Sequence, residues 1–414
     1  NVPIHLHTHD TAGIQSATYL KAIEAGVDII DVAIASMSGL TSQPNYNSLV
    51  AMLQGHHPRA NEIDLDTLNE FSNYWEDIRE YYYPFEADLK ASSTDVYEHE
   101  IPGGQYSNLR PQAEALGLGE KFEQIKKNYA IANRMFGDIV KVTPSSKVVG
   151  DFALFMTSNN LTEQEIMEKG HQISFPESVI ELFRGDIGQP EGGFPKELQK
   201  IILKDIKPFT NLPNEHLKPI DFEAEWKKFV EKYDTKYYDD LDLLSYLFYP
   251  KVFDDYYNAR AEGGNLMYVP TLPFFYGLKE NEETMITIDR GKSLIIKYLY
   301  KTQADKEGIC KVAFELNGQT RILRVKDKKF QTTQISNRKA SRSNENEIPS
   351  PLQGRIAEVF VKAGDSVKQN QPLFVIEAMK METTITAAKN CKVQEIVLNK
   401  GSMVEQEDLV VVIQ

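Results

Sequence analysis

The most regular pattern of hydrophobic and polar positions lies in the C-terminal part of the chain, from residue 350 onward. Short alternating segments are separated by turn glycines. The pattern occurs twice, because Ile356, Val359, Val361, Gly364 and Val367 recur at one constant interval as Val393, Ile396, Leu398, Gly401 and Val404. Alternation with period two is typical of strands with one buried face, and a repeat indicates a duplicated unit. We therefore predict a small two-fold flattened β-barrel over residues 350–414.

Residues 1–60 follow a different order of patterns. An extended start is followed by a turn at Asp10–Gly13, a helical period over Ala17–Ala25 that ends at Gly26, and an apolar run over Val27–Ala33. A nearly unbroken apolar run is typical of a parallel strand that is buried on both faces. Strand, helix and strand with polar residues at a strand's C-terminal end is the arrangement of a (β/α)8-barrel active site. We expect the last strands of such a barrel here.

Two further regions lie between these ends, and the fold class is therefore multidomain α/β. Helical patterns dominate residues 61–265. Strands are predicted between 266 and 330, with a hairpin turn at Asn317-Gly318, over Thr284–Asp289, Lys292–Tyr300, Cys310–Leu316 and Thr320–Val325. Residues 331–349 are polar and lack aromatic side chains after Phe330, which is typical of a flexible linker.

Composition and charge narrow the classes of partner. The chain has 414 residues, a formal net charge of -14 and a pI near 5.2, which argues against nucleic acid or an anionic membrane surface as a partner. Its two cysteines, Cys310 and Cys391, lie far apart, which excludes a disulfide framework and suits a reducing compartment, so we expect a cytoplasmic protein. The sequence opens on Asn1 without a leading Met, and we expect it to be part of a longer chain.

Lys380 is the first candidate for chemistry, because it lies at the predicted tip of a hairpin between two methionines, Met379 and Met381. A lysine at a tip points its amine into water, where it can be acylated; an ordinary exposed turn lysine is the alternative. The segment resembles the biotinyl domain of biotin-dependent carboxylases, and this resemblance implies that biotin is attached to Lys380. The chain departs from that family at 350–354, where Ser-Pro-Leu-Gln-Gly replaces the usual Pro-Met-Pro-Gly, and at Cys391, which replaces a turn glycine.

His5, His7 and His9 form the second candidate site, since alternate residues of a strand project from one face. Two imidazoles spaced in this way can share a metal ion, although ordinary structural histidines are the alternative. The stretch resembles the last part of the carboxyltransferase barrel of pyruvate carboxylase and its relatives. The resemblance implies that His7 and His9 bind zinc or manganese and that His5 does not belong to the pair. Ile14-Gln15 departs from the turn of that family.

A third candidate is the segment Lys141–Lys147, which contains Thr143-Pro144. Taken alone, Thr and Pro indicate the N-cap and first position of a helix. The same resemblance implies that the hydroxyl of Thr143 relays a proton between biotin and pyruvate, and that Ser146 and Lys147 contact the biotin ring. A hydroxyl suits this role because it both donates and accepts a hydrogen bond without leaving a charge. The segments 35–44 and 101–109 extend the resemblance, and Gly103-Gly104 lacks the Lys-Ser or Lys-Thr of a phosphate loop.

The resemblance covers the whole chain and implies an order of domains. These are the C-terminal barrel strands (1–60), a helical extension of the carboxyltransferase domain (61–265), an allosteric and tetramer-forming domain (266–330), the linker (331–349) and the biotinyl carrier (350–414). It implies a homotetrameric enzyme that converts pyruvate to oxaloacetate and is biotinylated by biotin protein ligase. ATP, magnesium and bicarbonate would act on a further domain, and acetyl-CoA or another small molecule could regulate the enzyme.

Two other interpretations stay open from the sequence. One is the biotin-bearing subunit of an oxaloacetate decarboxylase or transcarboxylase, which shares the barrel and the carrier. The other is a carrier and assembly module without catalysis. Because the remaining metal ligands and the pyruvate-binding residues of the family are expected on earlier barrel strands, we expect no turnover from this chain alone.

Overall fold

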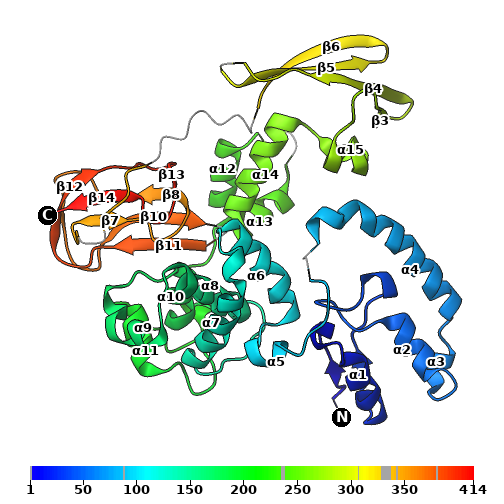
Figure 1. The fold of residues 1–414 in the computed structure, drawn as a ribbon, viewed down its shortest axis with the longest axis horizontal. Helices are drawn as coiled ribbons and strands as arrows, with labels where there is room; N and C mark the ends of the chain where they lie inside the picture. Colours follow the sequence, from blue (N-terminus) through cyan, green and yellow to red (C-terminus); the bar gives the residue numbers. More distant parts are fainter. Residues whose placement is uncertain are drawn as a thin grey trace. The chain divides into compact units, whose positions relative to one another are not determined.

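The computed structural model describes residues 2–86, 89–234, 238–305, 307–327, 337–341, 344–378 and 381–414 (Figure 1). They form two compact units, Asn1–His216 with Asn337–Gln414, and Leu217–Ser336. The division at 216 does not coincide with the predicted boundary at 265, and the domain boundaries stay a prediction. None of the described helices combines the length and the apolar character needed to span a bilayer.

The N-terminal segment is a strand–helix–strand unit. Strand β1 (His5–Leu6) pairs in parallel with β2 (Ile29–Ile30), and η1 (Asp10–Ala12) and α1 (Gln15–Glu24) connect them. The predicted strand over Val27–Ala33 is therefore too long. Its pairing with β1 involves Ile29 and Ile30. Beyond Asp31 the backbone instead forms hydrogen bonds with residues 44–46. The chain continues through η2 (Ala35–Met37), α2 (Tyr46–Leu53), α3 (Pro58–Asn61), α4 (Leu65–Arg79) and η3 (Glu80–Phe85).

A helical core follows, as the periodicity predicts. Its elements are α5 (Val96–His99), α6 (Gly103–Ala115), η4 (Gly119–Lys121), α7 (Phe122–Met135), α8 (Ser145–Ser158), α9 (Glu163–Lys169), η5 (Gly170–Gln172), α10 (Glu177–Arg184), α11 (Lys196–Leu203) and η6 (Pro213–His216). Every residue of α8 from Val148 to Ser158 is buried, so this helix forms the centre of the core. The Phe136 ring lies against Phe152 and Phe183, with centroids 5.1 and 4.9 Å apart. Such aromatic contacts add to the burial of apolar area.

Neutral His99 accepts a hydrogen bond from the segment that leads into α6. The backbone N–H of Ile101 donates to His99 Nδ1 at 3.0 Å, which requires that nitrogen to be unprotonated. Burial, with a smaller effect of the Lys126 charge, lowers the pKa of His99 to about 4. An unfolded histidine titrates near 6.5, so between about pH 6.5 and pH 4 the unfolded chain takes up a proton that the folded chain does not. The stabilising contribution of neutral His99 is therefore complete above about pH 6.5 and is lost as the pH falls.

We expect the thermal unfolding midpoint of this unit to drop on acidification from pH 7 to pH 4.5, with a His99 contribution of roughly 1–3 kcal/mol. His99→Gln, which keeps an acceptor but does not titrate, should show a smaller drop. Unfolding scans of both proteins over this range check the expectation. Equal drops in the two proteins would contradict it.

The C-terminal domain consists of two four-stranded sheets that repeat one pattern (Figure 1). The strands are β7 (Glu347–Pro349), β8 (Gly354–Val359), β9 (Ser366–Val367), β10 (Pro372–Ala378), β11 (Met381–Thr386), β12 (Cys391–Ile396), β13 (Met403–Val404) and β14 (Leu409–Ile413). The sheet orders are β11-β10-β8-β13 and β7-β14-β12-β9. Strands β8, β9 and β10 begin at 354, 366 and 372, and β12, β13 and β14 begin at 391, 403 and 409, a shift of 37 residues each time. The predicted duplication is confirmed.

Part of the predicted linker is folded onto this domain. The backbone N–H groups of Leu409 and Ala340 donate to the carbonyls of Arg338 and Glu407 at 2.7 and 2.8 Å. Lys339 pairs with Asp408 at 2.9 Å, and the Asp408 side chain is almost fully buried. The prediction of a flexible linker over 331–349 is therefore wrong for residues 337–341 and 344–349, because acidic partners distant in sequence hold this polar and basic segment in place.

The second unit, residues 217–336, combines helices with an antiparallel sheet. Its helices are α12 (Phe222–Lys232), α13 (Asp240–Phe248), α14 (Pro250–Gly263), η8 (Leu266–Tyr268) and α15 (Thr271–Tyr276), and its strands are β3 (Glu283–Asp289), β4 (Lys292–Lys301), β5 (Ile309–Leu316) and β6 (Gln319–Lys326). The strands pair in sequence order. Asn317 and Gly318 have φ of 47° and 81°, the left-handed values of a tight hairpin turn. The four predicted strands and this turn are confirmed.

Candidate functional site

Three side chains with imidazole or carboxylate groups meet at one edge of the parallel pair. His7 and His9 follow the end of β1, and Asp31 follows the end of β2. Because the strands are parallel, their carboxyl ends lie at the same edge, so these side chains come together. The expectation that residues of interest lie at a strand's C-terminal end is met, and Asp31 joins them although the sequence patterns did not single it out.

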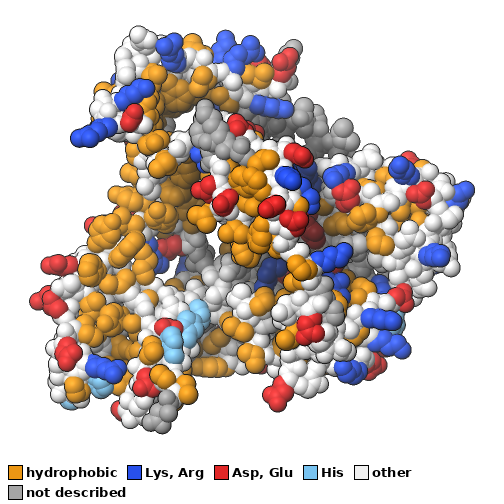
Figure 2. All heavy atoms as spheres, turned by 180° about the vertical axis from the view of Figure 1, so that it is seen from behind, with side chains coloured by type: hydrophobic (Ala, Val, Ile, Leu, Met, Phe, Trp, Pro, Cys, Tyr) orange, Lys and Arg blue, Asp and Glu red, His pale blue; other side chains and the backbone are white. Residues whose placement is uncertain are grey.

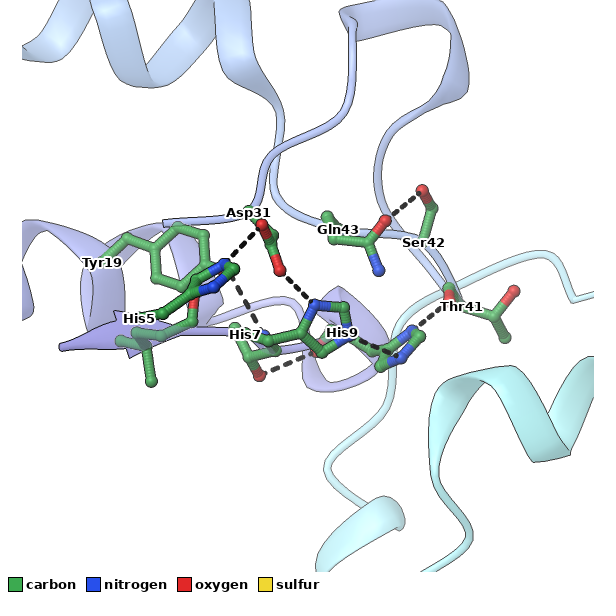
Figure 3. A network of polar contacts seen from close by, with 10 residues as sticks. His5, His7, His9, Tyr19, Asp31, Thr41, Ser42 and Gln43 are labelled. Atoms are coloured by element: carbon green, nitrogen blue, oxygen red, sulfur yellow. Dashed lines mark hydrogen bonds and ion pairs between the residues drawn. The ribbon is translucent and has the colours of Figure 1, made fainter. Parts of the chain in front are cut away.

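The Asp31 carboxylate accepts hydrogen bonds from two histidines (Figure 3). His5 Nε2 lies 2.8 Å from Asp31 Oδ1, and His7 Nδ1 lies 2.7 Å from Asp31 Oδ2. The hydrogen bonds from His5 and, next, from His7 hold the pKa of Asp31 below its ordinary value. A carboxylate that accepts from Nδ1 directs the other nitrogen of the His7 ring outward as an acceptor. His5 thus contacts the second carboxylate oxygen of Asp31, and its place outside the histidine pair stays a prediction.

The free nitrogens of His7 and His9 face each other. Their Nε2 atoms are 3.4 Å apart, while His9 Nδ1 donates to the carbonyl of Thr41 at 2.6 Å (Figure 3). A carbonyl only accepts, so His9 Nδ1 carries the proton and its Nε2 presents a lone pair. Zn–N bonds of about 2.0–2.1 Å in tetrahedral geometry place two such nitrogens about 3.3–3.4 Å apart. The donor set therefore fits one shared ion.

The histidine pair supplies two ligands, not a whole coordination sphere. Among the described residues no group of three or more His, Cys, Asp or Glu is arranged to hold a metal. The side chain of His7 is 52% exposed, and Figure 2 shows histidine side chains at the surface beside hydrophobic ones. A four-coordinate ion needs further ligands beyond these two.

The segment with the other site residues forms the start of α8. Thr143 is exposed, and its side chain does not cap the helix, which begins at Ser145 after Pro144. The alternative that Thr143 is the N-cap is therefore wrong, because Pro144 occupies that position. Ser145 Oγ accepts from the N–H of Val142 at 3.2 Å. The hydroxyl of Thr143 is not engaged as a cap. Ser146 is buried, and its carbonyl accepts from the Tyr129 hydroxyl at 3.2 Å.

Lys147 is held by a buried carboxylate that the sequence patterns did not single out. Lys147 Nζ lies 2.7 Å from Asp151 Oδ2, and Ser178 Oγ donates to the same oxygen at 2.7 Å. The Asp151 side chain has no exposed surface, and its Oδ1 has no hydrogen-bond partner among the described residues. Burial raises the pKa of Asp151, and the adjacent Lys147 opposes this rise. The Lys-to-Asp spacing of four residues on a helix was the available signal. Among the described residues, no hydrogen bond joins this helix start to the histidines.

Lys380 lies outside the described residues, but the hairpin around it is defined. Strands β10 and β11 pair in antiparallel register up to Ala378 opposite Met381. Strand β11 also contacts the helical core: the Thr386 N–H donates to Ser174 Oγ at 3.1 Å, and Thr383 forms a bridge with Pro176. These residues directly precede α10, the helix that carries Ser178. The strand that follows Lys380 is therefore packed against the element that helps to hold Asp151 and Lys147.

Comparisons with known proteins cover the whole chain. Residues 96–297 match the family model of a conserved carboxylase domain, and residues 346–413 match that of a biotin-requiring enzyme. Pyruvate carboxylase from Staphylococcus aureus is 46% identical over 414 residues, all of this chain and 36% of the relative. The human mitochondrial pyruvate carboxylase is 40% identical over 416 residues, 100% of this chain and 35% of the relative.

Solved structures give the same result. The carboxyl transferase domain of Rhizobium etli pyruvate carboxylase has a TM-score of 0.71 at 47% identity, covering 79% of this chain and 55% of that one. The complete multifunctional pyruvate carboxylase from the same organism has a TM-score of 0.70 at 43% identity, covering 99% of this chain and 38% of that one. The chain spans about a third of the length of the curated relatives it matches. With a conserved carboxylase domain and a biotin domain in one chain, the protein is similar from end to end to pyruvate carboxylases.

Proposed function

We propose that this chain is part of a biotin-dependent pyruvate carboxylase, and that the intact enzyme transfers CO2 from biotin on Lys380 to pyruvate, giving oxaloacetate. The observation that carries the proposal is the facing pair of His7 and His9 Nε2 atoms, 3.4 Å apart, in a chain that also contains a biotin domain. The proposed domains are barrel strands over 1–60, a helical extension over 61–265, an allosteric and tetramer-forming domain over 266–330, and a carrier over 350–414 to which residues 337–341 and 344–349 are added by their contacts.

Two groups absent from the chain itself would supply part of the chemistry. Biotin, when attached to Lys380, would supply the carboxyl group for the methyl carbon of pyruvate, and its ring nitrogen would be the acceptor for the proton which that carbon loses. Zinc or manganese, held by His7 and His9, would supply positive charge near the substrate oxygens. ATP, magnesium and bicarbonate would act on a domain outside this chain.

The chain's own residues orient the reactants and move one proton. Thr143 Oγ1 accepts the proton of the pyruvate methyl group and donates its own toward the biotin ring, so no charge is left on the hydroxyl. Lys147 has three N–H donors, and Asp151 occupies one of them, which leaves donors for the carbonyl of the biotin ring. Ser146 adds a hydroxyl at the same helix start.

Further partners belong to the same proposal. Biotin protein ligase would modify Lys380, and the intact enzyme would be a homotetramer. A structure of the Rhizobium etli enzyme with the allosteric activator acetyl coenzyme-A supports a similar effector here. The cytoplasmic location stays a prediction.

The test of the function uses the full-length protein. Labelled bicarbonate should enter oxaloacetate in a reaction that requires both pyruvate and ATP and is blocked by avidin. Incorporation that is insensitive to avidin would overturn the role of biotin. Loss of CO2 from oxaloacetate without any ATP requirement would assign the protein to the decarboxylase branch instead.

The metal site has its own prediction. His9→Ala in the full-length protein should lower the affinity for Zn²⁺ at least about tenfold, because one of the two facing nitrogens is lost. Metal content after dialysis and a binding isotherm measure the effect. His56→Ala changes an exposed histidine outside the cluster and should bind as the unsubstituted protein does. A His9→Ala protein that keeps its full metal content would contradict the proposal that His9 is a metal ligand.

A further inference from the structure

The start of α6 lies directly against His9. Helix α6 begins with Gly103-Gly104, and the preceding Ile101 is fully buried and bonded to His99 Nδ1 at 3.0 Å. The helix start is therefore anchored from behind, by contacts that do not involve the histidine cluster. It can retreat from His9 only if those contacts break.

The two glycines differ in what a side chain would meet. A Cβ at Gly103 would lie 2.8 Å from His9 Cβ, 2.9 Å from His9 Cγ and 2.8 Å from Thr11 Oγ1. A Cβ at Gly104 would meet only His9 Cε1, at an ordinary 3.7 Å. Gly103 is buried and Gly104 is exposed. Neither has a positive φ, so the backbone does not require glycine at either position and the demand at Gly103 is steric.

His9 has little room to yield to such a side chain. Its Nδ1 is bonded to the Thr41 carbonyl at 2.6 Å, and its Nε2 faces His7 Nε2 at 3.4 Å. The clashing atoms are the Cβ and Cγ of His9, at the root of the side chain, and a rotation of the ring does not remove them. Thr11 is also buried, and its Oγ1 has no hydrogen-bond partner in the part of the chain that the structure describes. A shift of His9 must therefore loosen its contact with Thr41 or its alignment with His7.

We infer that Gly103 is a positioning residue for the metal ligand His9. Its missing side chain lets the anchored helix start abut the root of His9, which keeps the His9 Nε2 atom directed at the shared ion. The inference rests on the proposed function of His7 and His9 as metal ligands. It also assigns a role to the Pro-Gly-Gly segment, for which the sequence provides no chemistry of its own.

The test compares Gly103→Ala with Gly104→Ala in the full-length protein, with Zn²⁺ alone as the probe. Alanine for glycine within a helix is otherwise favourable, so both variants should keep α6. Gly103→Ala should weaken Zn²⁺ binding by about 10- to 100-fold, the usual effect of disturbing the support of a ligand. Gly104→Ala should bind as the unsubstituted protein does. The inference is overturned if both variants bind Zn²⁺ as tightly as the unsubstituted protein does, or if both lose affinity to the same extent.

A thermal-unfolding cycle with His9→Gly covers the remaining outcomes. Gly103→Ala should lower the unfolding midpoint of the unsubstituted protein, and the effect should shrink when His9 is glycine, because the close contacts with His9 Cβ and Cγ are gone and only that with Thr11 Oγ1 is left. An undiminished effect overturns the inference. Should the unsubstituted protein bind no Zn²⁺ through His9, the metal site of the proposed function fails, whereas the cycle still reports the contact between Gly103 and His9.

Discussion

Lys380→Arg in the full-length protein is expected to carry no biotin and to show no incorporation of bicarbonate into oxaloacetate. Arginine keeps the positive charge at the hairpin, but its guanidinium is not a nucleophile for the ligating enzyme, so the carrier stays empty. The loss should be complete, since the proposed reaction has no other route for CO2. A streptavidin blot measures attachment, and the labelled-bicarbonate assay measures transfer.

Lys368→Arg is the matched control, because Lys368 is an exposed lysine in a turn of the same domain. It should be biotinylated and active. Biotin on the Lys380→Arg protein would move the attachment to another lysine. Activity without biotin would remove the carrier from the mechanism altogether.

Thr143→Ala is expected to slow carboxyl transfer by about 10²–10⁴-fold, the usual contribution of a positioned group that moves a proton. Biotin attachment and ATP cleavage that depends on bicarbonate should continue, since Thr143 lies at the start of α8 and not in the carrier. The two half-reactions, measured separately on one preparation, show this division. The exposed Thr143 side chain makes no helix cap, so little stability should be lost.

Thr143→Ser keeps the hydroxyl and should retain most of the transfer rate. A rate as low as that of the alanine variant would mean that the methyl group of Thr143, not its hydroxyl, matters. An alanine variant that transfers CO2 at the normal rate would take the proton step away from this residue.

The elements that are local in sequence could be predicted well. The duplicated strands of the carrier and the β3–β6 meander follow from alternation and from turn residues such as Asn317-Gly318, and both appear in the structure. In the β3–β6 meander each strand pairs with its neighbour along the chain, so a short pattern contains most of the information. In the carrier the strands themselves were predictable, but pairs such as β8 with β13 and β7 with β14 join segments that are distant in sequence. The strand predicted over Val27–Ala33 is much shorter in the structure, because strand length depends on neighbours that pair with it.

The candidate site was predictable only in its most conspicuous residues. The alternation of His5, His7 and His9 indicated a cluster, and the resemblance to the carboxyltransferase barrel singled out His7 and His9. Asp31, which orients His7, could not, because it is 24 residues away and only the parallel pairing of β1 and β2 brings it near. Asp151 could have been predicted as a partner of Lys147 from their spacing of four residues. Its complete burial could not, because it depends on the packing of α8 against α10.

The sequence by itself determined the classes of element, the two-fold repeat of the carrier and the residue types able to hold a metal or move a proton. These follow from periodicity, turn chemistry and side-chain chemistry, which are local properties. The tertiary structure alone decided that residues 337–341 and 344–349 belong to the folded carrier, that Asp31 directs His7, and that Gly103 leaves room for His9. Each of these depends on atoms distant in the chain that fill or leave a particular space, and a linear pattern does not contain that information.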